Sequence, residues 1–120
     1  MEDVAGILSN ITASGSRTLG TILHASGALE PAILQNISSR SMRGEYSGKV
    51  FGAEQLLSLS SAVPVGAIKL FSSLAAFSGS GGQGSYASAN AVLDSCAYSL
   101  QVGRHYPLLI KYRKSILSQP

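Results

Sequence analysis

Tryptophan is absent from this sequence of 120 residues, and cysteine occurs only once, as Cys96. A single cysteine excludes an internal disulfide bond, and the two histidines do not complete a Cys/His cluster with the spacing of a zinc site. We therefore expect no bound metal. A chain that does not rely on disulfide bonds is typical of a reducing compartment, so the expected location is the cytoplasm.

Signals for secretion or membrane insertion are also lacking. The chain begins Met1-Glu2-Asp3, which is acidic where a signal peptide carries positive charge. The most apolar stretch, residues 62–77, is interrupted by Pro64, by Lys69 and by a pair of serines, so it is a poor candidate for a membrane span. We expect no contact with a membrane.

Charged residues are scarce, at 12% of the sequence, and their balance is mildly basic. Nine lysine and arginine residues against six acidic residues give a net charge of +3. Three of the nine, Lys111, Arg113 and Lys114, lie together near the end of the chain. Short basic runs of this kind usually face water, so nucleic acid is not an expected partner.

Apolar residues make up 45% of the sequence, which is the content of a folded globular chain and not of a disordered one. A chain of this length buries roughly two-thirds of its unfolded surface when it folds. That is enough for one modest hydrophobic core. We expect one domain, or a piece of one.

The apolar residues change their period along the chain in a way that predicts alternating helices and strands. Residues 19–25 and 65–73 are short apolar runs typical of buried strands, whereas Ala89, Leu93 and Ala97 follow the spacing of one helical face. Strand, helix, strand, helix, strand is the pattern of parallel β-α-β units, so the expected class is α/β with a Rossmann-like, doubly wound parallel sheet. The expected elements are a helix over 2–11, a strand over 19–25, a loop or short helix through Pro31 and Leu34, a helix over 38–60, a strand over 65–73, a helix over 86–102 and a strand over 107–112.

Residues 70–90 hold the side chains best suited to chemistry. Ser73 ends a predicted strand, and ligands of open parallel sheets bind outside the carboxyl ends of the strands. Tyr86 and Asn90 are four residues apart at the start of a predicted helix, so they share one face of it. A tyrosine gives up a proton near neutral pH only when a cation or hydrogen bonds stabilise its phenolate, so a lysine is needed from elsewhere in the chain.

These residues resemble the ketoreductase domains of polyketide synthases, which belong to the short-chain dehydrogenase/reductase superfamily. The similarity lies in FSS followed by YASAN, with 13 positions from Ser73 to Tyr86. In that family the lysine lies on the preceding long helix, and SGKVFGAEQL, residues 47–56, resembles that helix and supplies Lys49. The segment TILHASGALEPAILQN, residues 21–36, resembles the strand and loop over which the adenosine side of the cofactor lies.

The resemblance implies NADPH-dependent reduction of a 3-oxoacyl thioester carried by an acyl carrier protein. It implies that Tyr86 gives a proton to the carbonyl oxygen as hydride arrives, while Ser73 holds that oxygen by a hydrogen bond. It implies that Lys49 stabilises the phenolate and binds the nicotinamide ribose, and that Asn90 helps to fix Lys49 through water. The residues implied to bind the cofactor are Ala25, Ser26, Gly27, Lys49 and Tyr86.

Each of these side chains has an ordinary structural interpretation when it is taken alone. Ser73 could cap a turn, Tyr86 could be a core or surface aromatic, Asn90 could be a polar helix residue and Lys49 could be a solvated charge. Their order and spacing inside one matching frame favour the catalytic interpretation. We therefore predict that the four side chains converge on one cleft at the carboxyl ends of the strands.

The segment from Gly79 to Gly84 satisfies the GxGxxG pattern of a dinucleotide-binding turn. The segment SLAAF separates the strand end from the first glycine of the pattern, whereas a phosphate-binding turn would follow the strand at once. No acidic residue lies about 20 residues further on, although Arg104 is there and could serve an NADP-binding variant. We predict that this loop belongs to the substrate side of the site.

The resemblance covers residues 3–110 and leaves 111–120 as a divergent tail. Counted against the family, the chain begins at the helix after the third strand, so the glycine-rich phosphate turn is expected before Met1. We therefore expect an incomplete ketoreductase domain, its carboxyl-terminal part. The Leu-Asp-Asp marker of product stereochemistry is replaced by Leu29-Glu30-Pro31, which leaves the stereochemical type open.

Two other functions stay open. The chain could be a non-catalytic truncated fragment, or a half-domain that needs an amino-terminal half on another chain. It could also be a 3-oxoacyl reductase of the fatty-acid-synthase type, which would share the fold without the displaced lysine. Cofactor binding by the chain alone separates the first of these alternatives from an enzyme.

Overall fold

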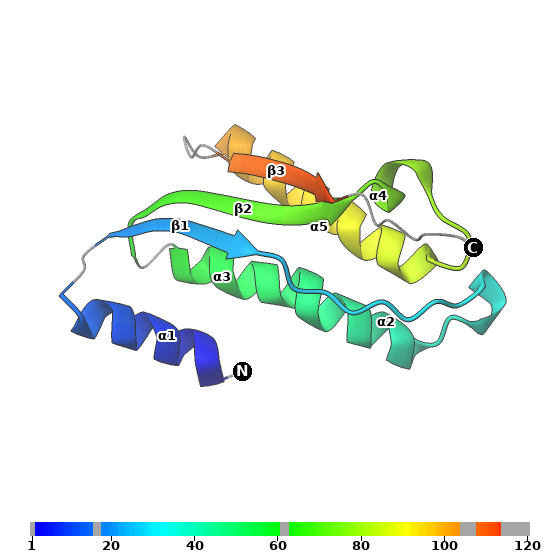
Figure 1. The fold of residues 1–120 in the computed structure, drawn as a ribbon, viewed down its shortest axis with the longest axis horizontal. Coiled ribbons are helices and arrows are strands. Elements are labelled where there is room, and N and C mark those ends of the chain that lie inside the picture. The colour runs from blue at the N-terminus through cyan, green and yellow to red at the C-terminus, as the bar shows by residue number, and fades with distance from the viewer. Residues whose placement is uncertain (1, 16–17, 61–62, 104–107, 114–120) are drawn as a thin grey trace.

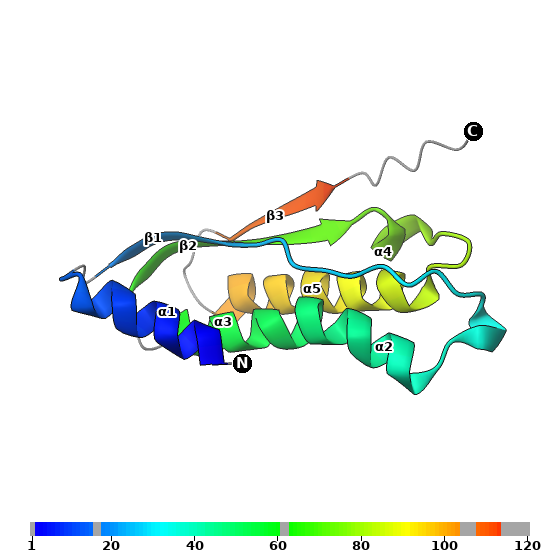
Figure 2. The same ribbon diagram turned by 60° about the horizontal axis from the view of Figure 1, so that its bottom comes forward.

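The protein is a three-stranded parallel sheet with its long helices packed on one face, as the computed structural model shows for residues 2–15, 18–60, 63–103 and 108–113 (Figures 1 and 2). Arg104 and most of the expected tail, residues 114–120 including Lys114, lie outside the described residues. The elements in chain order are α1 (Glu2–Ala13), β1 (Leu19–His24), a 3-10 turn (Leu34–Asn36), α2 (Ser39–Tyr46), a π-helical turn (Ser47–Phe51), α3 (Gly52–Ser60), β2 (Val65–Ser73), α4 (Ala75–Ser78), α5 (Gly84–Gly103) and β3 (Leu108–Arg113).

The strands lie in the order β1-β2-β3, and both pairs are parallel. Leu19 pairs with Val65 at the start of β1, and His24 pairs with Leu70 at its end. Because β2 continues to Ser73, its last residues extend past the end of β1 and pair with β3 alone. Parallel neighbours need crossover connections, and α2 with α3, and then α5, supply them. The predicted α/β class with a parallel sheet is confirmed.

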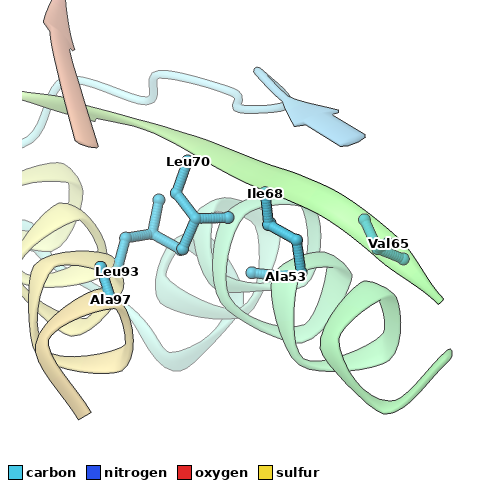
Figure 3. Packing of buried hydrophobic residues seen from close by; sticks show 6 residues of the cluster. All are labelled: Ala53, Val65, Ile68, Leu70, Leu93 and Ala97. Carbon is cyan, nitrogen blue, oxygen red and sulfur yellow. The ribbon is translucent and has the colours of Figure 1, made fainter. Parts of the chain in front are cut away.

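The hydrophobic core lies between the sheet and helices α3 and α5 (Figure 3). Ile68 and Leu70 of β2 point toward the helices because alternate residues of a strand face the same side. Leu93 and Ala97 of α5 meet Leu70, and Ala53 of α3 lies near Ile68 (Figure 3). The predicted buried face of the last helix is confirmed, since Ala89, Leu93 and Ala97 are all buried. The small alanine side chains let both helices approach the sheet closely.

The helix predicted over residues 38–60 forms, but it is not one regular α-helix. Ser38 caps it, because its hydroxyl accepts the Ser41 N–H (3.1 Å) while the Ser41 hydroxyl accepts the Ser38 N–H (3.1 Å). Between α2 and α3 the backbone widens into the π-helical turn Ser47–Phe51, called the π turn below. The Gly52 N–H there donates to the carbonyls of Lys49 and Ser47. Single π turns inside α-helices are rare and occur often at functional sites.

The glycine-rich loop lies between α4 and α5 and contacts the segment that follows β1. The Ala32 N–H donates to the Gly82 carbonyl (2.8 Å), and Ala32 forms an isolated bridge with Gln83. Gly79 and Gly82 have φ of 69° and 67°, which side chains rarely adopt, so glycine is required at both positions. The short helix α4 separates this loop from the end of β2.

None of the described helices is both long and apolar enough to cross a bilayer.

Candidate active site

A cavity of about 390 Å³ opens where β1 and β2 end, between these strands, the π turn and the start of α5. This is the edge of a parallel sheet at which ligands usually bind. The loop after β1 forms one wall, and the π turn and α5 contribute a cation and a phenol. The lining residues are Ala25, Ser26, Gly27, Ala28, Leu29, Lys49, Phe71, Ser72 and Tyr86.

Lys49 and Tyr86 lie together in this cavity. The Lys49 ammonium is 5.3 Å from the centroid of the Tyr86 ring, within the range of a cation–π contact. It also donates to the Phe71 carbonyl at 3.2 Å, while only 5% of the lysine surface is exposed. Burial lowers the pKa of the Lys49 ammonium from its ordinary value, because removal from water disfavours the charged form.

The loop after β1 packs tightly on the π turn, with a glycine on each side of the contact. A Cβ atom placed on Gly27 would lie 2.9 Å from Lys49 Cε, and one on Gly48 would lie 2.9 Å from the Ser26 hydroxyl. Contacts below 3.0 Å force a shift of the neighbouring atom. Of the loop residues predicted to bind the cofactor, Gly27 lies directly against Lys49, and Ser26 lies against Gly48. Both loop residues, with Ala25, line the same cavity as the lysine.

Asn90 lies one turn after Tyr86 and is fully buried. Its side-chain Nδ2 donates to the Tyr86 carbonyl at 2.7 Å, and its own backbone carbonyl accepts the Ser72 hydroxyl at 3.3 Å. The Asn90 Oδ1 atom is buried and has no hydrogen-bond partner among the described residues. A buried acceptor of this kind usually binds water or a ligand group. Asn90 does not line the cavity itself.

Ser73 ends β2 and is 1% exposed. Its hydroxyl oxygen accepts the Ala75 N–H at 3.2 Å, a local contact that caps the turn into α4. Ser73 is not among the residues that line the cavity, whereas its neighbour Ser72 is. In this structure the serine hydroxyl is thus engaged in the turn.

Several contributors were not identified from the sequence. Phe71 enters through its backbone carbonyl, which no side-chain motif encodes. The ring nitrogen of His24 lies 2.8 Å from the Lys49 carbonyl, a contact that no sequence motif indicated. Glu45, fully buried, accepts the Glu30 N–H at 2.9 Å through Oε1 and so ties down the loop after β1. Its position inside a helix gave no signal of burial.

A metal centre is not indicated in the part of the chain that the structure describes, where no group of three or more His, Cys, Asp or Glu side chains could hold an ion.

The site offers a set of polar groups. They are the buried cation of Lys49, the phenol of Tyr86, the nearby hydroxyls of Ser72 and Ser73, and the buried amide of Asn90. These groups suit the binding of a polar ligand and the transfer of a proton to it.

Comparisons with known proteins identify one family. The sequence model of the KR domain matches residues 1–106. Polyketide synthase GfsE of Streptomyces halstedii is 35% identical over 96 residues, which are 80% of this chain and 2% of that synthase. The chain thus spans a very small part of the curated relative.

Solved structures agree with this match. The first ketoreductase of the tylosin PKS superposes with a TM-score of 0.76 and 31% identity, over 88% of this chain and 23% of that one. The YIR035C short-chain dehydrogenase/reductase from Saccharomyces cerevisiae gives a TM-score of 0.82 at 18% identity, over 95% of this chain and 47% of that one. The second likeness concerns the fold alone.

Proposed function

The chain belongs to the KR domain family, the ketoreductase domains of polyketide synthases within the short-chain dehydrogenase/reductase superfamily, and we propose that it carries the proton-donating side of such a reductase. Enzymes of this family use a nicotinamide cofactor. The proposed substrate is a 3-oxoacyl thioester on an acyl carrier protein, and the proposed cofactor is NADPH.

The observation that carries this proposal is the position of the Lys49 ammonium above the Tyr86 ring, in a cavity at the carboxyl ends of the strands. A phenol that donates its proton to a carbonyl oxygen becomes negatively charged. A buried cation beside the ring of the phenol, here 5.3 Å from its centroid, stabilises such a negative charge. In this proposal Tyr86 is the proton donor and Lys49 is the cation that supports it.

The residues of the cavity fit a nicotinamide cofactor. An ammonium has three N–H donors, and among the described residues the Phe71 carbonyl accepts one, so the others can bind the ribose hydroxyls. The absence of a side chain at Gly27 leaves room for the Lys49 side chain beside the loop Ala25–Gly27, which lines the cavity. When bound, the cofactor supplies a hydride to the carbonyl carbon of the substrate.

Ser73 and Asn90 take supporting roles in this proposal. A hydroxyl that accepts one N–H keeps its own proton, so Ser73 can donate to the substrate oxygen after its side chain rotates. The buried Oδ1 atom of Asn90 is an acceptor that a water molecule could satisfy. A water held there would bridge to the Lys49 ammonium and restrain it.

One observation also favours the half-domain alternative. Leu23 on β1 is 62% exposed, and because its neighbours Ile22 and His24 face the helices, it points to the opposite face of the sheet. The chain spans 23% of the matched ketoreductase from the tylosin synthase. We propose that cofactor binding and turnover require further polypeptide, which covers this face and completes the phosphate contacts. Titration of the chain with NADPH, followed by fluorescence, tests this dependence.

The test of the proposed reaction needs a complete domain. A chimera that joins this segment to the amino-terminal part of a related ketoreductase should reduce a 3-oxoacyl thioester. Loss of that activity on Tyr86→Phe, with unchanged NADPH affinity, supports the proposed roles. A chimera that binds NADPH and shows no reduction would contradict the proposed reaction.

A further inference from the structure

His24 is the last residue of β1, and its side chain contacts the π turn. Its ring is 5% exposed, and its Nε2 atom lies 2.8 Å from the Lys49 carbonyl oxygen. The two residues come from different elements, a strand and a helix. The contact therefore joins the end of β1 to the π turn, where the helix departs from regular α-helical geometry.

The Lys49 carbonyl accepts two hydrogen-bonding groups in this arrangement. The Gly52 N–H reaches it from within the helix, and the His24 ring reaches it from outside. A carbonyl oxygen has two lone pairs, so both can be satisfied. A π turn is locally unfavourable compared with an α-helix, and a hydrogen bond from outside the helix compensates part of that cost.

The packing around His24 matches this role. A Cβ atom on Gly52 would lie only 3.1 Å from Cε1 of the histidine ring. A side chain at position 52 would therefore crowd the ring, and glycine leaves space for it. His24 and Gly52 together fit a turn that carries Lys49 on its cavity side.

The electrostatic surroundings favour the neutral form of the ring. Burial, and to a smaller degree the nearby Lys49 ammonium, lower the pKa of His24, although the hydrogen bond to the Lys49 carbonyl opposes them. A neutral imidazole carries its hydrogen on only one of its nitrogens, and a carbonyl oxygen can only accept. The geometry therefore requires the Nε2–H form, with Nε2 as the donor.

We propose that His24 is a positioning residue, whose Nε2–H holds the π turn at Lys49 and thereby keeps the Lys49 ammonium in the cavity beside Tyr86. The catalytic value of this arrangement rests on the proposed function. The effect of His24 on the position of Lys49 does not rest on the proposed function, because it can be measured without substrate or cofactor.

The first measurement reads the tautomer of His24 in the unaltered chain by long-range ¹H–¹⁵N NMR. Two histidines are present, and His24→Gln assigns the signals. The expected result is a hydrogen on Nε2. A hydrogen on Nδ1 with a bare Nε2 would overturn the proposal, because the ring could not donate to the carbonyl.

The second measurement titrates the lysine side chains by ¹³C NMR at Cε. Only four lysines occur in the sequence, and Lys49→Met identifies the relevant signal. In His24→Leu, which has no donor, the π turn relaxes, and the pKa of Lys49 should rise by about half a unit or more toward its ordinary value. In His24→Gln the amide can replace the ring N–H, so the pKa should stay where it is.

Ile22→Ala is the matched control, since Ile22 lies on the same strand and packs against the core cluster, of which Lys49 is not a member. An equal rise of the Lys49 pKa in this control, or no rise in folded His24→Leu, would overturn the proposal. If His24→Leu does not fold, the proposal is tested by the tautomer of His24 and by the pKa of Lys49 in His24→Gln. A failure of the proposed reduction would leave these readouts unchanged, so the two hypotheses fail separately.

Discussion

The Lys49 ammonium lies 5.3 Å from the centre of the Tyr86 ring, although the lysine comes from a π turn before β2 and the tyrosine from the first turn of α5 after it. The two crossovers of the parallel sheet bring these segments to the same strand ends. Neither residue would be a strong candidate alone. Their proximity in a buried cavity makes the pair the centre of the proposed site.

Lys49→Met should separate stability from function. The Lys49 ammonium is buried against a backbone carbonyl, which is costly for a charge, so replacing it with an apolar side chain of similar length should raise the free energy of unfolding by about 1 kcal/mol. Urea denaturation of both chains measures this difference. The same change should remove reduction in the chimera. A marked loss of stability would show instead that the lysine mainly holds the fold together.

The stability of the chain should depend on pH through His24. Its pKa is lowered in the folded state from the ordinary value of 6.5, so the unfolded chain binds more protons between these two pKa values. The His24 contribution is therefore fully present above pH 6.5 and is lost as the pH falls toward the folded pKa. The difference in unfolding free energy between the chain and His24→Gln should shrink as the pH falls through this window. A difference that is constant from neutral to acidic pH would contradict the assignment.

Gly27→Ala should displace Lys49 with little effect on folding. The new Cβ atom would meet Lys49 Cε at 2.9 Å, near the flexible end of that side chain, so the lysine can move aside. Because a misplacement of about 1 Å can cost about 10²-fold in rate, the chimera should lose roughly that much activity. Gly81→Ala is the control, since nothing lies within 4 Å of its Cβ position. Equal rates for the two variants would show that the loop does not set the lysine position.

The order of helices and strands could be predicted because the apolar period changes clearly along the chain. The period of α5 gave its buried face through Ala89, Leu93 and Ala97. The π turn could not be predicted, because Gly48 only weakens a helix and the contact with His24 comes from a distant strand. Local spacing describes a regular helix, and a tertiary hydrogen bond decides where it departs from one.

The candidate site was predictable to the extent that its residues lie at element ends. Tyr86 meets this condition, whereas Lys49 lies inside a predicted helix and was expected at the site only from the resemblance to the ketoreductases. The two side chains line the same cavity. The contact of Ser73 with the Ala75 N–H is a local choice of rotamer, which a sequence pattern does not specify. The Phe71 carbonyl holds Lys49 through the backbone, so the identity of that side chain carried no information.

The central claim is that Tyr86 donates the proton, and the rate of reduction by the chimera tests it most directly. Tyr86→Phe removes the hydroxyl and keeps the ring, so packing and NADPH affinity should not change. General acid catalysis contributes about 10²- to 10⁴-fold, and the rate of 3-oxoacyl thioester reduction should fall by that factor. A Tyr86→Phe chimera that keeps more than about half of its rate would show that another group supplies the proton.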